Sequence, residues 1–189
     1  MTYRICFIIG LIFLLTGQLL LAQGNDFVYS QSPIDFAHWF LLVGVVCLIP
    51  QVVTFPKSIF SVIGIPLTLI GIASMIGMCV LDFIFWSYPN DQMRNEFASH
   101  VTQVPSIWKT FITIGPSSKV FNVGLLILSL NYLSTKKIAI GILLIACLIL
   151  WHAIPVPFRL VFGYSLTLVS FALILLGKQE KDELKFSQS

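Results

Sequence analysis

SIFSVIGIPLTLIGIASMIGMCVLDFIFW, residues 58–86, is a continuous apolar stretch in which Asp82 is the only charged residue. An α-helix rises about 1.5 Å per residue, so about 20 apolar residues cross the ~30 Å hydrocarbon core of a bilayer. Strands of a membrane barrel alternate between apolar and polar residues, and this stretch does not. It therefore predicts a membrane-spanning helix with length to spare for tilt.

The composition of the whole chain agrees with a membrane protein. Of its 189 residues, 57% are hydrophobic and 10% are charged, and the mean hydropathy is +0.94. Soluble domains carry about 25% charged residues, and a soluble fold of this size could not bury so much apolar surface. The net charge of +3 comes from scattered residues, which argues against a nucleic-acid partner. We expect the lipid bilayer to be the main partner, with other membrane subunits as further candidates.

Five more apolar runs accompany this stretch, at residues 4–22, 36–53, 118–133, 138–152 and 158–177. We therefore predict an all-α membrane protein, with one transmembrane domain over residues 1–189 that forms a polytopic bundle of about six transmembrane helices. Most links between the runs are short, so consecutive spans should be antiparallel. Residues 4–22 also have the pattern of a secretory signal peptide, and cleavage after Ala22 would leave five spans.

Residues 87–117 are the one long connection in the second half of the chain. Within them, Met93, Phe97, Val101 and Val104 recur at helical spacing with polar residues between them. This pattern indicates an amphipathic helix. We predict an interfacial segment between spans three and four, with an ordinary surface helix packed on the bundle as the alternative.

The short loops favour one orientation in the membrane. Lys57, Lys136 and Lys137 fall on the same side of the predicted bundle, and cytoplasmic loops are enriched in Lys and Arg. Both termini should then face the cytoplasm if the first span is retained, and residues 178–189 should form a cytoplasmic tail. The plasma (inner) membrane is the default location.

The four tryptophans all fall on the predicted outer side. Trp39 opens the second span, Trp86 closes the third, Trp108 lies in the long loop and Trp151 ends the fifth. Indoles favour the membrane interface, where the ring is in an apolar layer and the N–H meets water. We therefore expect these four residues to be interface anchors.

Ionisable residues gather on the same outer side. His38, Asp82, His152 and Arg159 lie near the outer ends of their spans, and a charge inside a span needs a partner. We expect Asp82 to pair with Arg159 or His152, and His38 is a third candidate partner. The group either holds helices together or forms a ligand or proton site for a cation, a lipid head group or a proton.

No cofactor or metal site is predicted. Haem iron held between His38 and His152 is a further hypothesis, but no spacing motif supports it. The four cysteines lie inside apolar runs and no CxxC pair occurs, so we interpret them as buried apolar side chains.

Two small residues of the third span, Ala73 and Gly77, are four residues apart and so share one helix face. Such a pair lets a neighbouring helix approach closely, and we predict that it forms a helix-packing site.

No catalytic signature occurs in the sequence. We therefore expect a non-enzymatic membrane subunit or binding module. One alternative is a transporter or channel with an outward-facing polar site, and a second is a membrane-embedded enzyme or haem protein that uses the same residues.

Overall fold

The computed structural model describes residues 1–114 and 119–177, and these residues form helices and turns without a strand. The all-helical prediction is confirmed. Six helices occupy the six apolar runs: α1 (Thr2–Leu21), α3 (Phe36–Val52), α4 (Ile59–Ser87), α7 (Lys119–Ser129), α8 (Lys137–Leu150) and α9 (Arg159–Leu175). A short 3-10 turn, η2 (Leu130–Tyr132), continues α7. The predicted tail, residues 178–189, lies outside the described residues.

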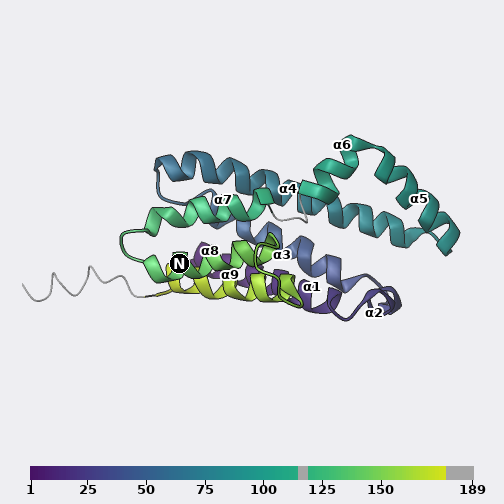
Figure 1. Ribbon diagram of the computed structural model, residues 1–189, viewed down its shortest axis with the longest axis horizontal. Helices are drawn as coiled ribbons and strands as arrows, with labels where there is room; N and C mark the ends of the chain where they lie inside the picture. Colours follow the sequence, from purple (N-terminus) through teal and green to yellow (C-terminus); the bar gives the residue numbers. More distant parts are fainter. Residues whose placement is uncertain (115–118, 178–189) are drawn as a thin grey trace, which may run out of the picture.

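The connections contain additional helices. α2 (Asn25–Ser30), which the sequence did not predict, lies between α1 and α3. The predicted amphipathic segment contains α5 (Asp91–Gln103), then α6 (Pro105–Ile107) and a π-helical turn, η1 (Trp108–Ile114). Figure 1 shows that α5 folds back beside the end of α4. Val101 of α5 is buried, while Gln92, Asn95 and the other polar residues of the helix are mostly exposed.

Polar side chains mark where several helices begin. Asp35 accepts a hydrogen bond from the backbone N–H of His38 at the start of α3. Ser58 accepts one from Ser61 at the start of α4, and Asn90 caps α5 in the same way. These side chains satisfy N–H groups that have no partner inside the helix, each contributing roughly 0.5–2 kcal/mol.

The long helices pack side by side into an elongated bundle (Figure 1). α1 packs against α3 and α9, α4 packs against α7 and α3, and α8 packs against α9 and α7. Each of α1, α3, α7 and α9 contributes fully buried apolar side chains to one core: Phe7, Leu11, Leu14, Leu41, Leu48, Phe121, Leu125 and Phe171. α1 is therefore an integral part of the bundle.

Glycines set the closest helix contacts. A Cβ added to Gly71 would lie 2.5 Å from Cβ of Phe121, and one added to Gly124 would lie 2.4 Å from Oγ1 of Thr68. α4 and α7 thus touch along a face of small residues. The predicted packing pair is different: Ala73 is exposed, and Gly77 contacts Phe111 of η1 rather than a long helix. The reason is rotational, since Ala73 lies about 200° around the helix axis from Gly71.

By length and composition, α1 and α4 are the two described helices that could cross a membrane. Residues 36–52, 119–132, 137–150 and 159–175 form shorter apolar helices. Buried core helices and signal sequences also pass the same test. The test therefore supports membrane association only weakly.

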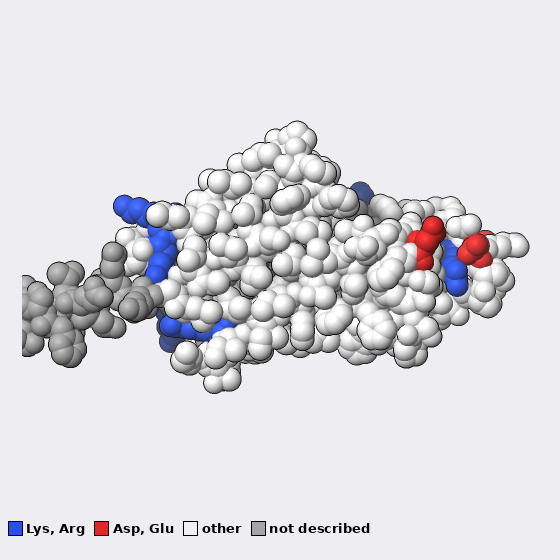
Figure 2. All heavy atoms as spheres, turned by 90° about the horizontal axis from the view of Figure 1, so that it is seen from below, with Lys and Arg blue, Asp and Glu red and all other residues white. Residues whose placement is uncertain are grey.

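Charged side chains gather at the two ends of the bundle. Arg4, Lys57, Lys136 and Lys137 lie where α1, α4 and α8 begin, and we call this the basic end. At the opposite end, Asp26, Asp35, Asp82, Asp91 and Glu96 lie in or beside α2, the start of α3, the end of α4 and α5, and we call this the acidic end. On the face in Figure 2, a broad girdle without charged side chains separates the two ends, apart from one basic group set further back toward the acidic end.

Candidate functional site

The four ionisable residues predicted as a site lie at the acidic end but divide into two groups. His152 and Arg159 line one pocket together with Gln18, and His38 contacts Asp82 elsewhere. Asp82 therefore pairs with His38, the third candidate, and the expected pairing with Arg159 or His152 is wrong. α4 packs against α3 and α7, whereas His152 and Arg159 belong to the α8–α9 connection. A similar position along the bundle axis therefore did not bring Asp82 into contact with His152 or Arg159.

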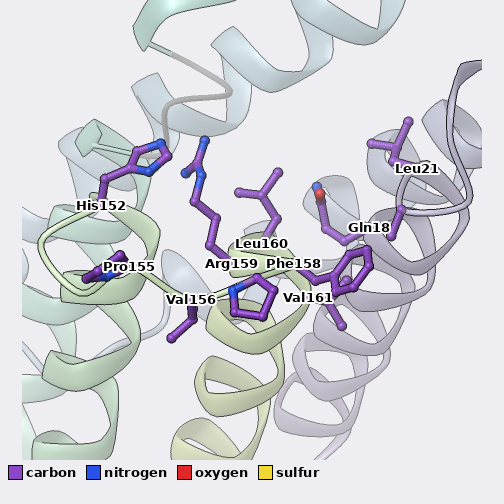
Figure 3. Close-up of a pocket in the computed structure, with 11 residues that line it drawn as sticks. Gln18, Leu21, His152, Pro155, Val156, Phe158, Arg159, Leu160 and Val161 are labelled. Atoms are coloured by element: carbon purple, nitrogen blue, oxygen red, sulfur yellow. The ribbon is translucent and has the colours of Figure 1, made fainter.

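The pocket around Arg159, which we call the Arg159 pocket, has a volume of about 630 Å³. α1 contributes Gln18, Leu21 and Ala22, and the α8–α9 connection with the first turn of α9 contributes the rest. Arg159 donates a hydrogen bond from Nη1 to the carbonyl oxygen of Leu150 at 2.8 Å. Figure 3 shows the guanidinium beside the imidazole of His152, with the amide of Gln18 on the same side of the pocket.

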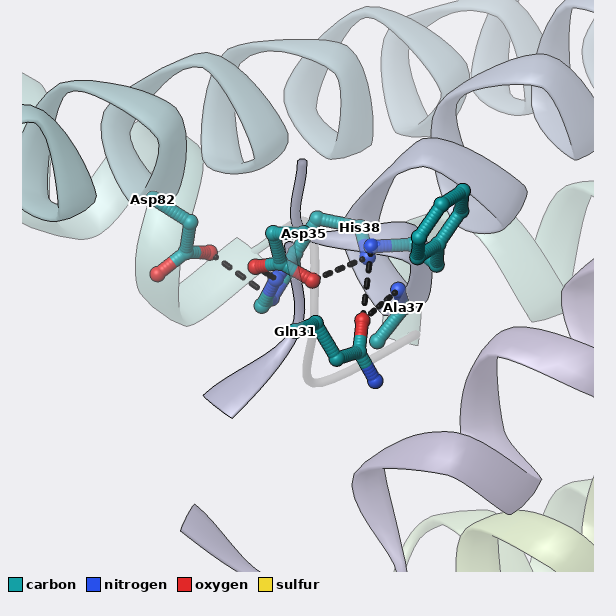
Figure 4. Close-up of polar contacts among 6 residues, drawn as sticks. Gln31, Asp35, Ala37, His38 and Asp82 are labelled. Carbon is teal, nitrogen blue, oxygen red and sulfur yellow. Dashed lines mark hydrogen bonds and ion pairs between the residues drawn. The ribbon is translucent and has the colours of Figure 1, made fainter. Parts of the chain in front are cut away.

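The second group is a cluster of Asp35, His38 and Asp82, which we call the carboxylate–histidine cluster (Figure 4). His38 Nε2 lies 3.1 Å from Oδ2 of Asp82, and its Nδ1 contacts the carboxylate of Asp35. The backbone N–H of His38 also donates to Oδ1 of Asp35 at 3.1 Å. An imidazole donates from both ring nitrogens only when it is protonated, so the imidazolium form satisfies both carboxylates.

The three side chains of the cluster differ in how far they are buried. Asp35 is 8% exposed and His38 is 8% exposed, whereas the side chain of Asp82 is 33% exposed. Burial raises the pKa of Asp35, but hydrogen bonds from the side chain and backbone of His38 outweigh it and hold the pKa below its usual value. Asp35 therefore stays ionised and fixes the ring, while Asp82 meets solvent.

Gln31 supports the cluster from the preceding loop. Its side-chain oxygen accepts hydrogen bonds from the backbone N–H groups of Phe36 at 2.7 Å and Ala37 at 3.3 Å. Figure 4 shows this amide next to Asp35. With Asp35, it satisfies the N–H groups of the first turn of α3, and so fixes where His38 points.

An aromatic pocket of about 450 Å³ adjoins the cluster, because Asp35 lines it together with Tyr29, Trp39, Trp86 and Arg94. The rings of Tyr29 and Trp86 are 3.7 Å apart between centroids, and the guanidinium of Arg94 lies 4.7 Å from the Trp86 ring. Burial, and then the charge of Asp82, raise the pKa of Tyr29. The pocket thus combines aromatic walls with one acidic and one basic side chain.

The four tryptophans predicted as interface anchors occupy different settings. Trp39 and Trp86 line the aromatic pocket, and Trp108 is exposed at the start of η1. Trp151 is half-buried at the end of α8, and its indole N–H has no hydrogen-bond partner among the described residues. Their interfacial role stays a prediction.

The site predicted from the sequence left out three residues of these sites. Gln18 is a polar residue on the buried side of an apolar run, and its position inside that run was a usable signal. Asp35 stands in the helix-capping position before α3, which was also recognisable. Nothing in the sequence indicated Gln31, because the hydrogen bond between its side chain and the backbone of Phe36 depends on the path of the loop.

In the part of the chain that the structure describes, no three His, Cys, Asp or Glu side chains come together in a way that could hold a metal ion. The haem hypothesis does not fit the geometry either. Both ring nitrogens of His38 contact carboxylates, so neither is directed at an iron, and His152 lines a different pocket.

Comparisons of this chain with protein-family models, with curated proteins and with solved structures gave no match.

Proposed function

We propose that this chain is a multi-pass integral membrane protein that crosses the bilayer with six helices and acts as a binding module or subunit at its outer face. The observation that carries this proposal is the girdle between the basic and acidic ends, which is nearly free of charged side chains on the face in Figure 2. A charge at the centre of a bilayer is costly, by roughly 2.5–3.5 kcal/mol on insertion scales. Placing most of the charges at two opposite ends reduces that cost.

Exposed apolar side chains in the girdle support the same proposal. Val46, Ile70 and Leu144 lie in the middle of α3, α4 and α8 and are 46%, 53% and 47% exposed. Exposed apolar surface costs about 25 cal/mol per Å² in water, and soluble monomers rarely expose large continuous patches of it. Lipid removes this cost.

The lengths of the shorter helices are compatible with spanning. α8 has 14 residues and rises about 21 Å, which is less than a ~30 Å hydrocarbon core. The connection that follows it, residues 153–158, is mostly apolar and extends the hydrophobic path. Local thinning of the bilayer can accommodate the remaining mismatch.

Two features support the orientation and the retention of α1. The short loops at the basic end carry Lys57, Lys136 and Lys137, and Lys and Arg in short loops favour the cytoplasmic side of a membrane. α1 contributes the fully buried Phe7, Leu11 and Leu14 to the core, and its removal would open the bundle along α3 and α9. Both features support a six-span protein with the acidic end outside.

A binding role fits the carboxylate–histidine cluster better than catalysis. A general base needs a ring nitrogen within reach of the substrate proton. In this cluster both nitrogens of His38 contact carboxylates, an arrangement that fixes the ring and joins α3 to α4. The aromatic pocket beside the cluster and the separate Arg159 pocket are the places where a ligand or a partner would bind.

Proton-coupled transport is the second candidate function. The observation that favours it is the contact between His38 and Asp82, which joins α3 to α4 across a partly exposed, titratable pair. Movement of a proton at this pair would change the contact between two helices. Replacing Asp82 by Asn in proteoliposomes that report proton flux separates the candidates. A transporter loses its flux, whereas a binding module shows no flux with either chain.

Cysteine labelling tests the proposed topology. In a background with the four native cysteines replaced by Ala, Asn95→Cys places a thiol on exposed α5 and Thr135→Cys places one in an exposed loop at the basic end. In intact cells, a membrane-impermeant maleimide should label Asn95→Cys, and it should label Thr135→Cys only after permeabilisation. Extraction of the chain by alkaline carbonate, or labelling of both sites in intact cells, would refute the proposal.

A further inference from the structure

The Arg159 pocket combines an unpaired cation with an unsatisfied amide. Arg159 is half-buried, and none of the ion pairs between described residues includes it. Among the residues that line the pocket, none is acidic. Its guanidinium has five N–H donors, of which one is bonded to the carbonyl oxygen of Leu150. The other N–H groups of this planar guanidinium can bind an oxyanion, most of all a phosphate.

The N-terminus of α9 adds a second anion-favouring feature at the same place. Its N-cap residue, Phe158, provides no side-chain hydrogen bond to the first turn, and residues 158–161 line the pocket. The first N–H groups of a helix have no partner within it and carry the positive end of the helix dipole. These groups favour a bound anion.

Gln18 supplies the observation that points to a particular kind of anion. It is 7% exposed, it lines the pocket, and its Oε1 has no hydrogen-bond partner among the described residues. A buried acceptor left unsatisfied costs roughly 1–3 kcal/mol. The matching ligand therefore offers a hydroxyl or ammonium donor as well as an anionic group.

The backbone of the α8–α9 connection and the apolar lining of the Arg159 pocket also fit a bound ligand. His152 and Phe158, at the two ends of the α8–α9 connection, have left-handed backbone with φ of 62° and 49°. This conformation is unfavourable for a residue as bulky as Phe. Phe158 lines the pocket and is 66% exposed. Leu21, Leu160 and Val161 complete an apolar lining beside the charged groups.

We infer that the Arg159 pocket binds the head group of an anionic glycerophospholipid, in the manner of phosphatidylglycerol. The phosphate accepts hydrogen bonds from Arg159 and the start of α9, a head-group hydroxyl donates to Oε1 of Gln18 when that amide turns toward the pocket, and the acyl chains leave past Phe158 into the bilayer. The volume of about 630 Å³ lies within the usual range for ligand pockets. This inference rests on the proposed membrane placement, which puts the acidic end at the lipid head groups.

Thermal unfolding of the detergent-purified full chain tests the inference. Phosphatidylglycerol should raise the melting temperature more than phosphatidylcholine does. Arg159→Gln should weaken the apparent affinity for phosphatidylglycerol by about tenfold or more, since it removes hydrogen bonds to a charged group. Gln18→Leu should weaken it by a smaller factor. Lys109→Gln, an exposed cation on η1, is the control and should leave the lipid effect unchanged.

Several outcomes would overturn the inference. Equal stabilisation by both lipids would do so, as would an unchanged response in Arg159→Gln. Stabilisation by free glycerol phosphate that matches the lipid would indicate a soluble phosphate ester as the ligand. If Arg159→Gln fails to fold, Arg159→Lys, which keeps the charge and loses the planar guanidinium, and Gln18→Leu carry the same test. A chain that inserts into membranes but ignores the lipid refutes only this inference, whereas a chain extracted by carbonate refutes the proposed function as well.

Discussion

His38 lies between two carboxylates whose roles differ. Asp35 is buried, caps α3 and contacts the ring, so its loss removes two interactions at once. The side chain of Asp82 is 33% exposed and makes one contact, with the far ring nitrogen. Solvent screens a contact of that kind. The two residues should therefore contribute unequally to stability.

Substitutions in this cluster should reflect that difference. Asp35→Ala should lower the free energy of unfolding by about 2–3 kcal/mol, because it removes a helix cap and a charged hydrogen bond. Asp82→Asn should lower it by about 1 kcal/mol or less. Asp91→Asn is the control, since its carboxylate is 90% exposed and should contribute no more than about 0.5 kcal/mol. Denaturant unfolding in detergent measures all three, and equal losses for Asp35 and Asp82 would contradict this account.

Acid should affect the wild type through Asp35. The pKa of Asp35 is lower in the folded chain than its usual value, so its contribution is fully present above about pH 4 and is lost as the pH falls through the lower folded value. Unfolding measured between about pH 5 and pH 3 should show this loss of stability, and Asp35→Asn should show a smaller loss over that range. Identical pH profiles for the two chains would exclude Asp35 as a contributor.

At the residue scale the sequence indicated which groups gather at one end, but not which of them touch. Apolar runs give the depth of His38, Asp82 and Arg159, because depth follows from counting residues along a helix. Lateral neighbours depend on which helices pack together. The short link between α3 and α4 predicted that these two helices are neighbours, but no residue pattern indicated which helices the α8–α9 connection lies beside. For this reason Arg159 was expected near Asp82 and lies in another pocket.

At the scale of elements, the contact between α4 and α7 depends on small residues. Gly64, Thr68 and Gly71 of α4 face Gly124 and Phe121 of α7, so the backbones approach closely along this face. Close approach brings favourable van der Waals contacts between membrane helices, where no hydrophobic force drives them together. This face has no space for an added methyl group.

Gly71→Ala should therefore destabilise the bundle. The new Cβ would lie 2.5 Å from Cβ of Phe121, and overpacking of this kind costs about 1–3 kcal/mol. Gly141→Ala in α8 is a matched control, because a Cβ there meets nothing within 4 Å. It should be neutral or stabilising by up to about 1 kcal/mol. Melting temperatures measured side by side decide the point, and a neutral Gly71→Ala would remove the proposed role of this face.

The positions of the long helices could be predicted from sequence, whereas their contact faces could not. Apolar runs bounded by Pro, Ser and Lys locate α3, α4, α8 and α9 to within a few residues. The choice of Ala73 with Gly77 rested on spacing alone, and α4 contains several small residues from which more than one such pair can be drawn. α2 escaped prediction because six residues are too few to show a periodic pattern.

At the scale of the whole molecule, the proposed membrane placement depends on where the charged side chains lie. On the face in Figure 2, the basic end, a girdle with few charged side chains and the acidic end follow one another along the long axis of the bundle. Hydrophobicity along the chain predicted this order, because most charged residues fall in the links between the apolar runs or near the ends of the runs. Both candidate pockets lie at the acidic end, and their proposed roles depend on the girdle lying in lipid.

The most direct test measures what surrounds the girdle. The experiment compares spin labels at five positions in lipid bilayers. Three labels lie in the girdle, at the exposed mid-helix residues Val46, Ile70 and Leu144. Two lie near the ends of the bundle, at Asn95 and Thr135. The native cysteines are first replaced by Ala. Power-saturation spectroscopy then reports collision with oxygen, which dissolves in lipid, and with a water-soluble nickel chelate. We predict that oxygen dominates at the three girdle positions and nickel at the two end positions, and high nickel accessibility across the girdle would contradict the account.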